Sequence, residues 1–114
     1  MRFQPDLKGV TPILTAVPPE STRKGGDSSH GGNQYVRARL GMAEHVGWAY
    51  ERPEGGRGFG ITGAHFHKNW GDENFRKIVL NAILWTAQME VPPNGVECAV
   101  TAEDLTKNLD PKGK

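Results

Sequence analysis

The hydrophobic positions of this chain fall into short alternating stretches, followed by one stretch with helical spacing. Residues 10–17 are rich in β-branched side chains and predict a strand, in which Pro12 indicates a sheet edge or an irregular start. Residues 45–51 alternate apolar and polar side chains and predict a second strand. The turn residues at 53–56 lead into a third strand over residues 57–66, so the last two strands are expected to form a β-hairpin.

A single long helix is predicted after the third strand. Asp72 is a suitable N-cap, Glu73 in the first turn is favoured by the helix dipole, and the helix should end near Met89, before Pro92. The apolar positions predict a broad buried stripe that packs on a sheet and on another element beside it. The stripe contains Phe75, Ile78, Val79, Leu80, Ala82, Ile83, Leu84 and Trp85.

The remaining segments are polar or ambiguous. Residues 20–33 form a long, glycine-rich polar loop, of a length that is usually either functional or disordered. For residues 36–42, an extended piece and a turn of helix both remain open. Residues 102–105 predict a short helical turn, which is followed by a basic tail.

Composition narrows the classes of function. The chain has 114 residues, enough for one domain at most, and its 15 Gly and 8 Pro make it rich in turns. With 14 Lys and Arg against 13 Asp and Glu, the net charge of +1 gives no reason to expect nucleic acid or an anionic membrane as a partner. No apolar run is long enough to span a membrane, the first residues do not form a signal peptide, and Cys98 has no disulfide partner. The chain is therefore expected to be soluble, in a compartment that the sequence leaves unknown.

Two histidines at the end of the third predicted strand are the leading candidates for chemistry. His65 and His67 are two residues apart, so on a strand their side chains would share one face. That arrangement suits one divalent metal such as zinc, or one histidine that acts as a catalytic base while the other orients a substrate. No third ligand is indicated by the local spacing. The alternative is structural, with both imidazoles capping the strand and binding backbone groups in the turn before Trp70.

Further candidates for substrate binding lie in the long loop and in the turn after the histidines. Asp27, His30 and Asn33 form a polar cluster with Arg23 nearby, which is suited to binding a sugar or to completing a metal site. The alternative for these loop residues is a solvated segment with Asx turns. Trp70 is placed to stack on a sugar ring, whereas the other two tryptophans, Trp48 and Trp85, are expected in the core.

The glycines of the third predicted strand do not form a nucleotide site. Gly58, Gly60 and Gly63 lie within or at the end of the strand, whereas a dinucleotide fingerprint needs its glycines in the turn that opens the helix. Glycines inside a strand more often mark the close approach of another group.

Several short motifs together resemble the carboxy-terminal half of the trehalose-utilisation (ThuA-like) domain. The match extends over about residues 1–96. The motifs are Pro12-Ile13-Leu14, the loop with Asp27, His30 and Gly32-Asn33, Glu51-Arg52-Pro53, Gly55-Gly56-Arg57-Gly58-Phe59-Gly60, Gly63-Ala64-His65-Phe66-His67, Trp70, Phe75-Arg76, and Leu80-Asn81-Ala82-Ile83-Leu84-Trp85-Thr86-Ala87. The family usually has Gly at the position of Ala64.

The resemblance implies an α/β, flavodoxin-like (class I glutamine amidotransferase-like) three-layer fold. It places His67 where those amidotransferases have their catalytic histidine. The Pro-Glu that should follow is replaced by Lys68-Asn69, and no nucleophilic cysteine precedes it, so the resemblance does not support glutamine hydrolysis by a triad.

The resemblance also implies a truncated domain and a role in carbohydrate metabolism. Residues 1–97 would be the carboxy-terminal part of a ThuA-like domain and residues 98–114 a tail, with a sheet edge and an apolar face left uncovered. The expected ligand is a sugar, such as trehalose or a keto-sugar, bound by His65, His67 and Trp70. A non-catalytic binding or structural fragment is the alternative, and both an enzymatic activity and a homo-oligomer remain open.

Overall fold

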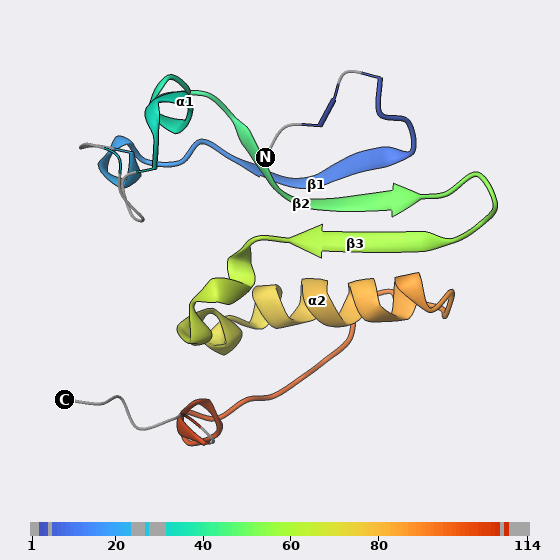
Figure 1. The fold of residues 1–114 in the computed structure, drawn as a ribbon. Coiled ribbons are helices and arrows are strands. Elements are labelled where there is room, and N and C mark those ends of the chain that lie inside the picture. Colours follow the sequence, from blue (N-terminus) through green and yellow to red (C-terminus); the bar gives the residue numbers. More distant parts are fainter. Residues whose placement is uncertain (1–2, 5, 24–26, 28–31, 108, 110–114) are drawn as a thin grey trace.

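The computed structural model describes residues 3, 4, 6–23, 27, 32–107 and 109 (Figure 1). It contains a sheet, one long helix and several short helical turns. In chain order these are β1 (Val10–Ala16), η1 (Glu20–Thr22), α1 (Gln34–Arg37), β2 (Glu44–Glu51), β3 (Arg57–Ile61), η2 (Gly63–His65), η3 (His67–Gly71), α2 (Glu73–Thr86) and η4 (Asp104–Thr106). The predicted mixture of strands and helix is confirmed, and residues 34–37, which overlap the ambiguous segment, form a helical turn.

The three strands form an antiparallel sheet in the order β1-β2-β3. The predicted hairpin of β2 and β3 is confirmed, with Glu51 opposite Arg57 and Gly47 opposite Ile61. Pro12 lies in the edge strand β1, where the register with β2 shifts after Pro12 and again after Leu14. The missing N–H of proline is tolerated at such an irregular edge.

Close packing inside the hairpin explains one of the strand glycines. Gly60 lies opposite Trp48, and a Cβ at this position would lie 2.4 Å from Trp48 Cζ2. Phe3 packs against the same indole edge to face, with 5.9 Å between the ring centroids. The approaching group that the strand glycine accommodates is therefore a side chain of the neighbouring strand.

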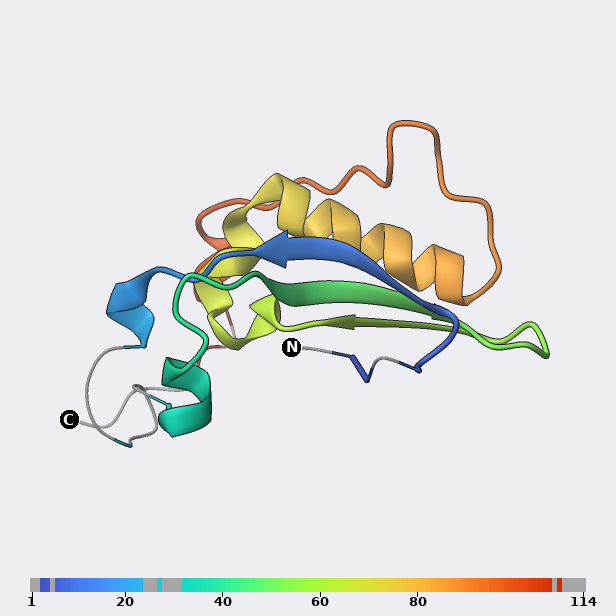
Figure 2. The ribbon, with the colours of Figure 1, turned by 90° about the horizontal axis from the view of Figure 1, so that it is seen from above.

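Helix α2 packs against one face of the sheet (Figure 2). Asp72 is its N-cap as predicted, because the carboxylate Oδ1 accepts a hydrogen bond of 2.8 Å from the backbone amide of Phe75. The helix ends at Thr86, three residues before the predicted end, and Gln88 then adopts a left-handed conformation with φ of 59°. That conformation ends the helical hydrogen-bond ladder before the prolines are reached.

The prediction of a strand over residues 57–66 is wrong in its second half. Strand β3 ends at Ile61, and Thr62 already has helical ψ, after which the chain turns through η2 and η3. Two contacts stabilise this turn. Asn69 Nδ2 donates to the Gly63 carbonyl at 2.6 Å, and a Cβ on Gly63 would lie 2.7 Å from the ring of Phe75. The chain after Ile61 therefore packs against Phe75 of α2 and does not continue β3.

The core is small. Among the described apolar side chains, Ala82 on α2 is the one counted as buried, and the predicted stripe residue Ile83 is 57% exposed, so its predicted burial is wrong. A cavity of about 390 Å³ lies between the sheet and α2, lined by residues such as Ala49, Phe59 and Trp85. The accessible surface is 8820 Å², compared with roughly 6200 Å² for a compact monomer of this mass. The radius of gyration is 17.2 Å, compared with about 13 Å for a compact chain of this length.

A wide apolar surface is therefore left open on the sheet and on α2. Within the described part of the chain, no helix is long and apolar enough to cross a membrane.

Candidate functional site

The two histidines leave the end of β3 on separate helical turns. His65 is the last residue of η2 and His67 the first of η3, with Phe66 in extended conformation between them. The prediction that they share one face of a strand is therefore wrong. Side chains alternate with a period of two only in a strand, and β3 ends four residues before His65.

His67 is oriented by the carboxy-terminal segment. Its Nε2 lies 2.9 Å from the carbonyl oxygen of Leu105. A carbonyl can only accept, so Nε2 carries the hydrogen and donates it, and in the neutral ring Nδ1 keeps the lone pair. Within the described residues, Nδ1 has no hydrogen-bond partner. This nitrogen is therefore available to accept a proton or a hydrogen bond.

A pocket of about 340 Å³ lies beside His67, between η3, α2 and the carboxy-terminal segment. It contains two of the predicted site residues, His67 and Trp70. Its lining residues are His67, Trp70, Arg76, Leu80, Cys98, Val100, Asp104 and Leu105. The indole of Trp70 is held edge to face against Phe75, with 5.0 Å between the ring centroids.

Arg76 holds the wall of this pocket together. Its side chain is 8% exposed. Nε and Nη2 donate to the carbonyl of Cys98 at 3.2 and 3.0 Å, and Nη1 donates to the carbonyl of Trp70 at 2.8 Å. One buried guanidinium thus ties α2 both to the turn after the histidines and to the segment that follows the helix.

Asp104 places a negative charge at the same pocket. The hydroxyl of Thr101 donates to its carboxylate at 2.7 Å, and Lys107 Nζ lies 2.9 Å away on the other oxygen. The Thr101 hydrogen bond, followed by that of Lys107, lowers the pKa of Asp104 to about 2. The carboxylate is therefore ionised at neutral pH, within the pocket that His67 lines.

His65 has a different environment. Its ring packs edge to face on Phe66, with 4.9 Å between centroids, and it is not among the residues that line the pocket of His67. In the described part of the chain, no group of three or more His, Cys, Asp or Glu side chains is arranged to hold a metal ion. The predicted zinc site on His65 and His67 thus gains no third ligand from these residues.

The described residues of the predicted loop cluster, Asp27 and Asn33, have partners away from the histidines. Asp27 Oδ1 pairs with Arg37 Nη2 at 2.6 Å. Asn33 caps α1, because its Oδ1 accepts from the backbone amides of Tyr35 and Val36 at 3.0 and 3.2 Å, which is the Asx-type role considered for this loop. His30 lies outside the described residues. Asp27 and Asn33 do not line the pocket that contains His67 and Trp70.

Sequence reasoning missed Arg76, Asp104 and Leu105 as parts of the site. Arg76 lies within the predicted helix but would be expected at its solvated surface, because nothing in the local pattern shows that a segment 22 residues later covers it. Asp104 and Leu105 lie in the predicted helical turn, a segment that was expected to be only a tail. The Thr101-to-Asp104 spacing of a capped turn was the available signal.

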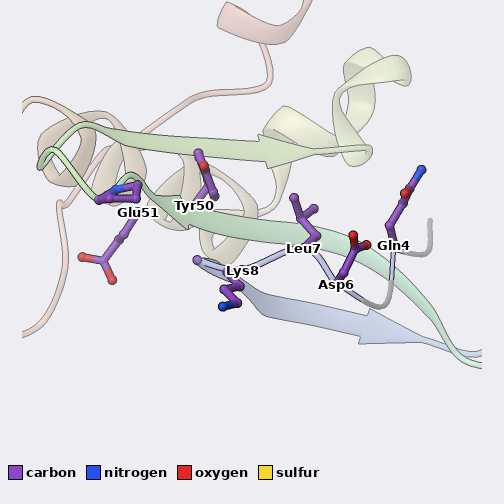
Figure 3. Close-up of a pocket in the computed structure, with 8 residues that line it drawn as sticks. Gln4, Asp6, Leu7, Lys8, Tyr50 and Glu51 are labelled. Carbon is purple, nitrogen blue, oxygen red and sulfur yellow. The ribbon is translucent and has the colours of Figure 1, made fainter.

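Another pocket lies between the residues that precede β1 and the end of β2 (Figure 3). It has a volume of about 440 Å³ and is formed by residues 4 and 6–9, the end of β2 and Pro53. Figure 3 shows Leu7 beside β2 and the charged groups of Asp6, Lys8 and Glu51 around the opening. Of the described residues that the sequence predicted to bind a substrate, none lines this pocket.

Comparison with protein families, with curated proteins and with solved structures finds no match to this chain.

Proposed function

We propose that this chain is a ThuA-like protein that binds a carbohydrate in the pocket between η3, α2 and the carboxy-terminal segment. One observation carries the proposal: His67 and Trp70, both singled out from sequence, line the same pocket of about 340 Å³. An aromatic face beside a few polar groups is the usual arrangement of a small-molecule site. Trehalose and keto-sugars are the expected ligands.

His67 would make the polar contact with the sugar. Its Nε2 is committed to the Leu105 carbonyl, so the lone pair of Nδ1 would accept a hydrogen bond from a sugar hydroxyl. If the protein is an enzyme, the same nitrogen would act as the proton acceptor, since imidazole exchanges protons near neutral pH.

We further propose that the sheet and α2 form part of a flavodoxin-like, three-layer fold. The open apolar surface supports this proposal, since a three-layer fold covers both faces of its sheet with helices. The apolar residues Ile13 and Leu14 on β1 and Ile83 on α2 would then be covered.

The experiment that tests the carbohydrate site is calorimetric titration of the full chain with trehalose. We expect binding that is weakened about two- to tenfold by Trp70→Ala, because a stacked aromatic contributes about 0.5–1.5 kcal/mol. The matched control is Phe66→Ala, which removes an aromatic side chain that is 61% exposed and lies outside the pocket. Equal binding by the two variants, or no binding of trehalose and of a keto-disaccharide by the unaltered chain, would contradict the proposal.

A second candidate, a non-catalytic structural fragment, is favoured by the small core described above. In that case the unaltered chain would bind none of the sugars, and its surface would be covered by another part of a larger protein.

A zinc titration of the chain and of the His65→Ala/His67→Ala variant tests the predicted metal site. Loss of zinc binding in the variant would assign the metal to this pair.

A further inference from the structure

A further pocket, which contains three charged side chains, lies at the end of the sheet where β1 ends and β2 begins. Its volume is about 470 Å³, and it is separate in its lining from the pocket of His67. In Figures 1 and 2, η1 and α1 lie side by side at this end of the sheet. The lining residues are Pro18, Arg23, Asn33, Tyr35, Val36, Arg39 and Glu44.

Two arginines in this pocket share one carboxylate oxygen. Arg39 Nε donates to Glu44 Oε1, and Arg23 Nη2 lies 3.6 Å from the same oxygen. All three side chains are largely shielded, with exposed fractions of 7% for Arg23, 19% for Arg39 and 12% for Glu44. The hydrogen bond from Arg39 lowers the pKa of Glu44 to about 2, so this carboxylate is ionised at neutral pH.

The charges of this cluster do not balance. Among the described residues, two guanidinium groups face one carboxylate, which leaves a net positive charge in a concave, largely shielded site. The neighbouring Arg37 does not change this sum, because it is paired with Asp27. Among the described residues, Glu44 is the one acid within ion-pair distance of Arg23 or Arg39. A shielded charge without a counter-charge is costly, and a bound anion removes that cost.

Donors for such an anion remain available. Arg23 Nη1 donates to the carbonyl of Arg39 at 2.5 Å, and Arg39 Nη2 donates to the carbonyl of Ala43 at 3.3 Å. Within the described part of the chain, Arg23 Nε and Arg39 Nη1 have no hydrogen-bond partner. Guanidinium groups bind phosphate and carboxylate oxygens through their planar set of N–H groups.

We propose that the pocket of Arg23, Arg39 and Glu44 binds the oxyanion group, phosphate or carboxylate, of a small metabolite. Arg23 and Arg39 contact the oxyanion, and Tyr35 and Pro18 lie against the uncharged part of the ligand. This site is independent of the carbohydrate site proposed above, because it uses none of its residues.

The test is calorimetric titration of the full chain with inorganic phosphate, glucose 6-phosphate and gluconate, with uncharged glucose as the reference. We expect at least one of the anions to bind, more weakly as salt is added, and glucose not to bind at this site. Arg39→Gln should weaken anion binding at least about tenfold, the usual effect of losing a charge-assisted hydrogen bond. The matched control is Arg52→Gln, since Arg52 lies over the ring of Tyr50 at the hairpin and does not line the pocket.

The ligand series also distinguishes the two sources of the oxyanion. Binding of glucose 6-phosphate without gluconate identifies a phosphate ester, and the reverse identifies a sugar acid. Arg39→Lys keeps the charge but loses the planar donor set, so it should give intermediate binding. If Arg39→Gln does not fold, the anion affinity of Arg39→Lys tests the role of Arg39 in its place. The proposal is overturned if none of the anions binds, or if Arg39→Lys and Arg52→Gln both bind as the unaltered chain does.

Discussion

Two glycines on the same face of β3 predict opposite effects for the same substitution. Gly58 and Gly60 are two residues apart in one strand, and neither has a positive φ, so alanine is permitted at both. A Cβ at Gly60 would lie 2.4 Å from Trp48 Cζ2 and 2.5 Å from Cε2, whereas a Cβ at Gly58 meets nothing within 4 Å. Trp48 is also packed against Phe3, which restricts its movement away from the strand.

The magnitude of each effect can be worked from these contacts. Replacing Gly by Ala restricts the unfolded chain and stabilises the folded state by about 0.4–1 kcal/mol where the backbone permits it. Gly58→Ala should therefore raise the free energy of unfolding by that amount. Gly60→Ala gains the same term but adds a steric overlap that costs about 1–3 kcal/mol. The two variants should differ by that overlap cost, or by roughly 4–12 °C in Tm at about 4 °C per kcal/mol.

Urea unfolding followed by tryptophan fluorescence and by circular dichroism measures both values. The fluorescence of Gly60→Ala should also change in the folded state, because the indole of Trp48 must move. A Gly60→Ala variant as stable as Gly58→Ala would refute the packing of Trp48 across β3.

Three other effects are expected. The hydrogen bond from Arg39 lowers the folded-state pKa of Glu44 from 4.5 to about 2. The ionised Glu44 therefore contributes fully to the free energy of unfolding above about pH 4.5, and this contribution is lost as the pH falls toward 2. In an acid titration of stability, Glu44→Gln should lack this loss. Ala82→Asp should unfold the chain by burying an unpaired charge. Ile83→Asp should change the urea midpoint little, because Ile83 is 57% exposed. Equal effects of the two substitutions would argue against the observed orientation of α2. Asp72→Ala should cost about 1 kcal/mol in urea unfolding through loss of the N-cap, and Asp72→Ser should restore most of it.

Much of the secondary structure could be predicted from local patterns. Alternating side chains located β1, β2 and the start of β3, the turn residues before Arg57 predicted the hairpin, and Asp72 marked the start of α2. These features depend on interactions between residues close in sequence, such as the hydrogen bond from the Phe75 amide to Asp72. The same local reasoning extended β3 to residue 66, because it could not include the packing of Gly63 on Phe75.

The candidate site was predicted only in part. His67 and Trp70 were identified because histidine and tryptophan in a turn after a strand suit ligand binding, and the structure brings both to one pocket. The separation of His65 from that pocket depends on where β3 ends. Asn33 was also expected to bind substrate, but it caps α1 and lines the pocket of Arg23, Arg39 and Glu44.

By itself, the sequence determined where the three strands begin, the hairpin turn and the start of the long helix. Each of these depends on side-chain periodicity, turn residues or caps within a few positions. The tertiary structure alone decided which polar groups meet. Arg76 reaches the carbonyl of Cys98, and Leu105 orients His67 across 38 residues. Arg23 likewise reaches Glu44, which lies 21 residues later in the chain. Such contacts join segments that have no local relation in the sequence, so their energies enter only once the chain has folded back on itself.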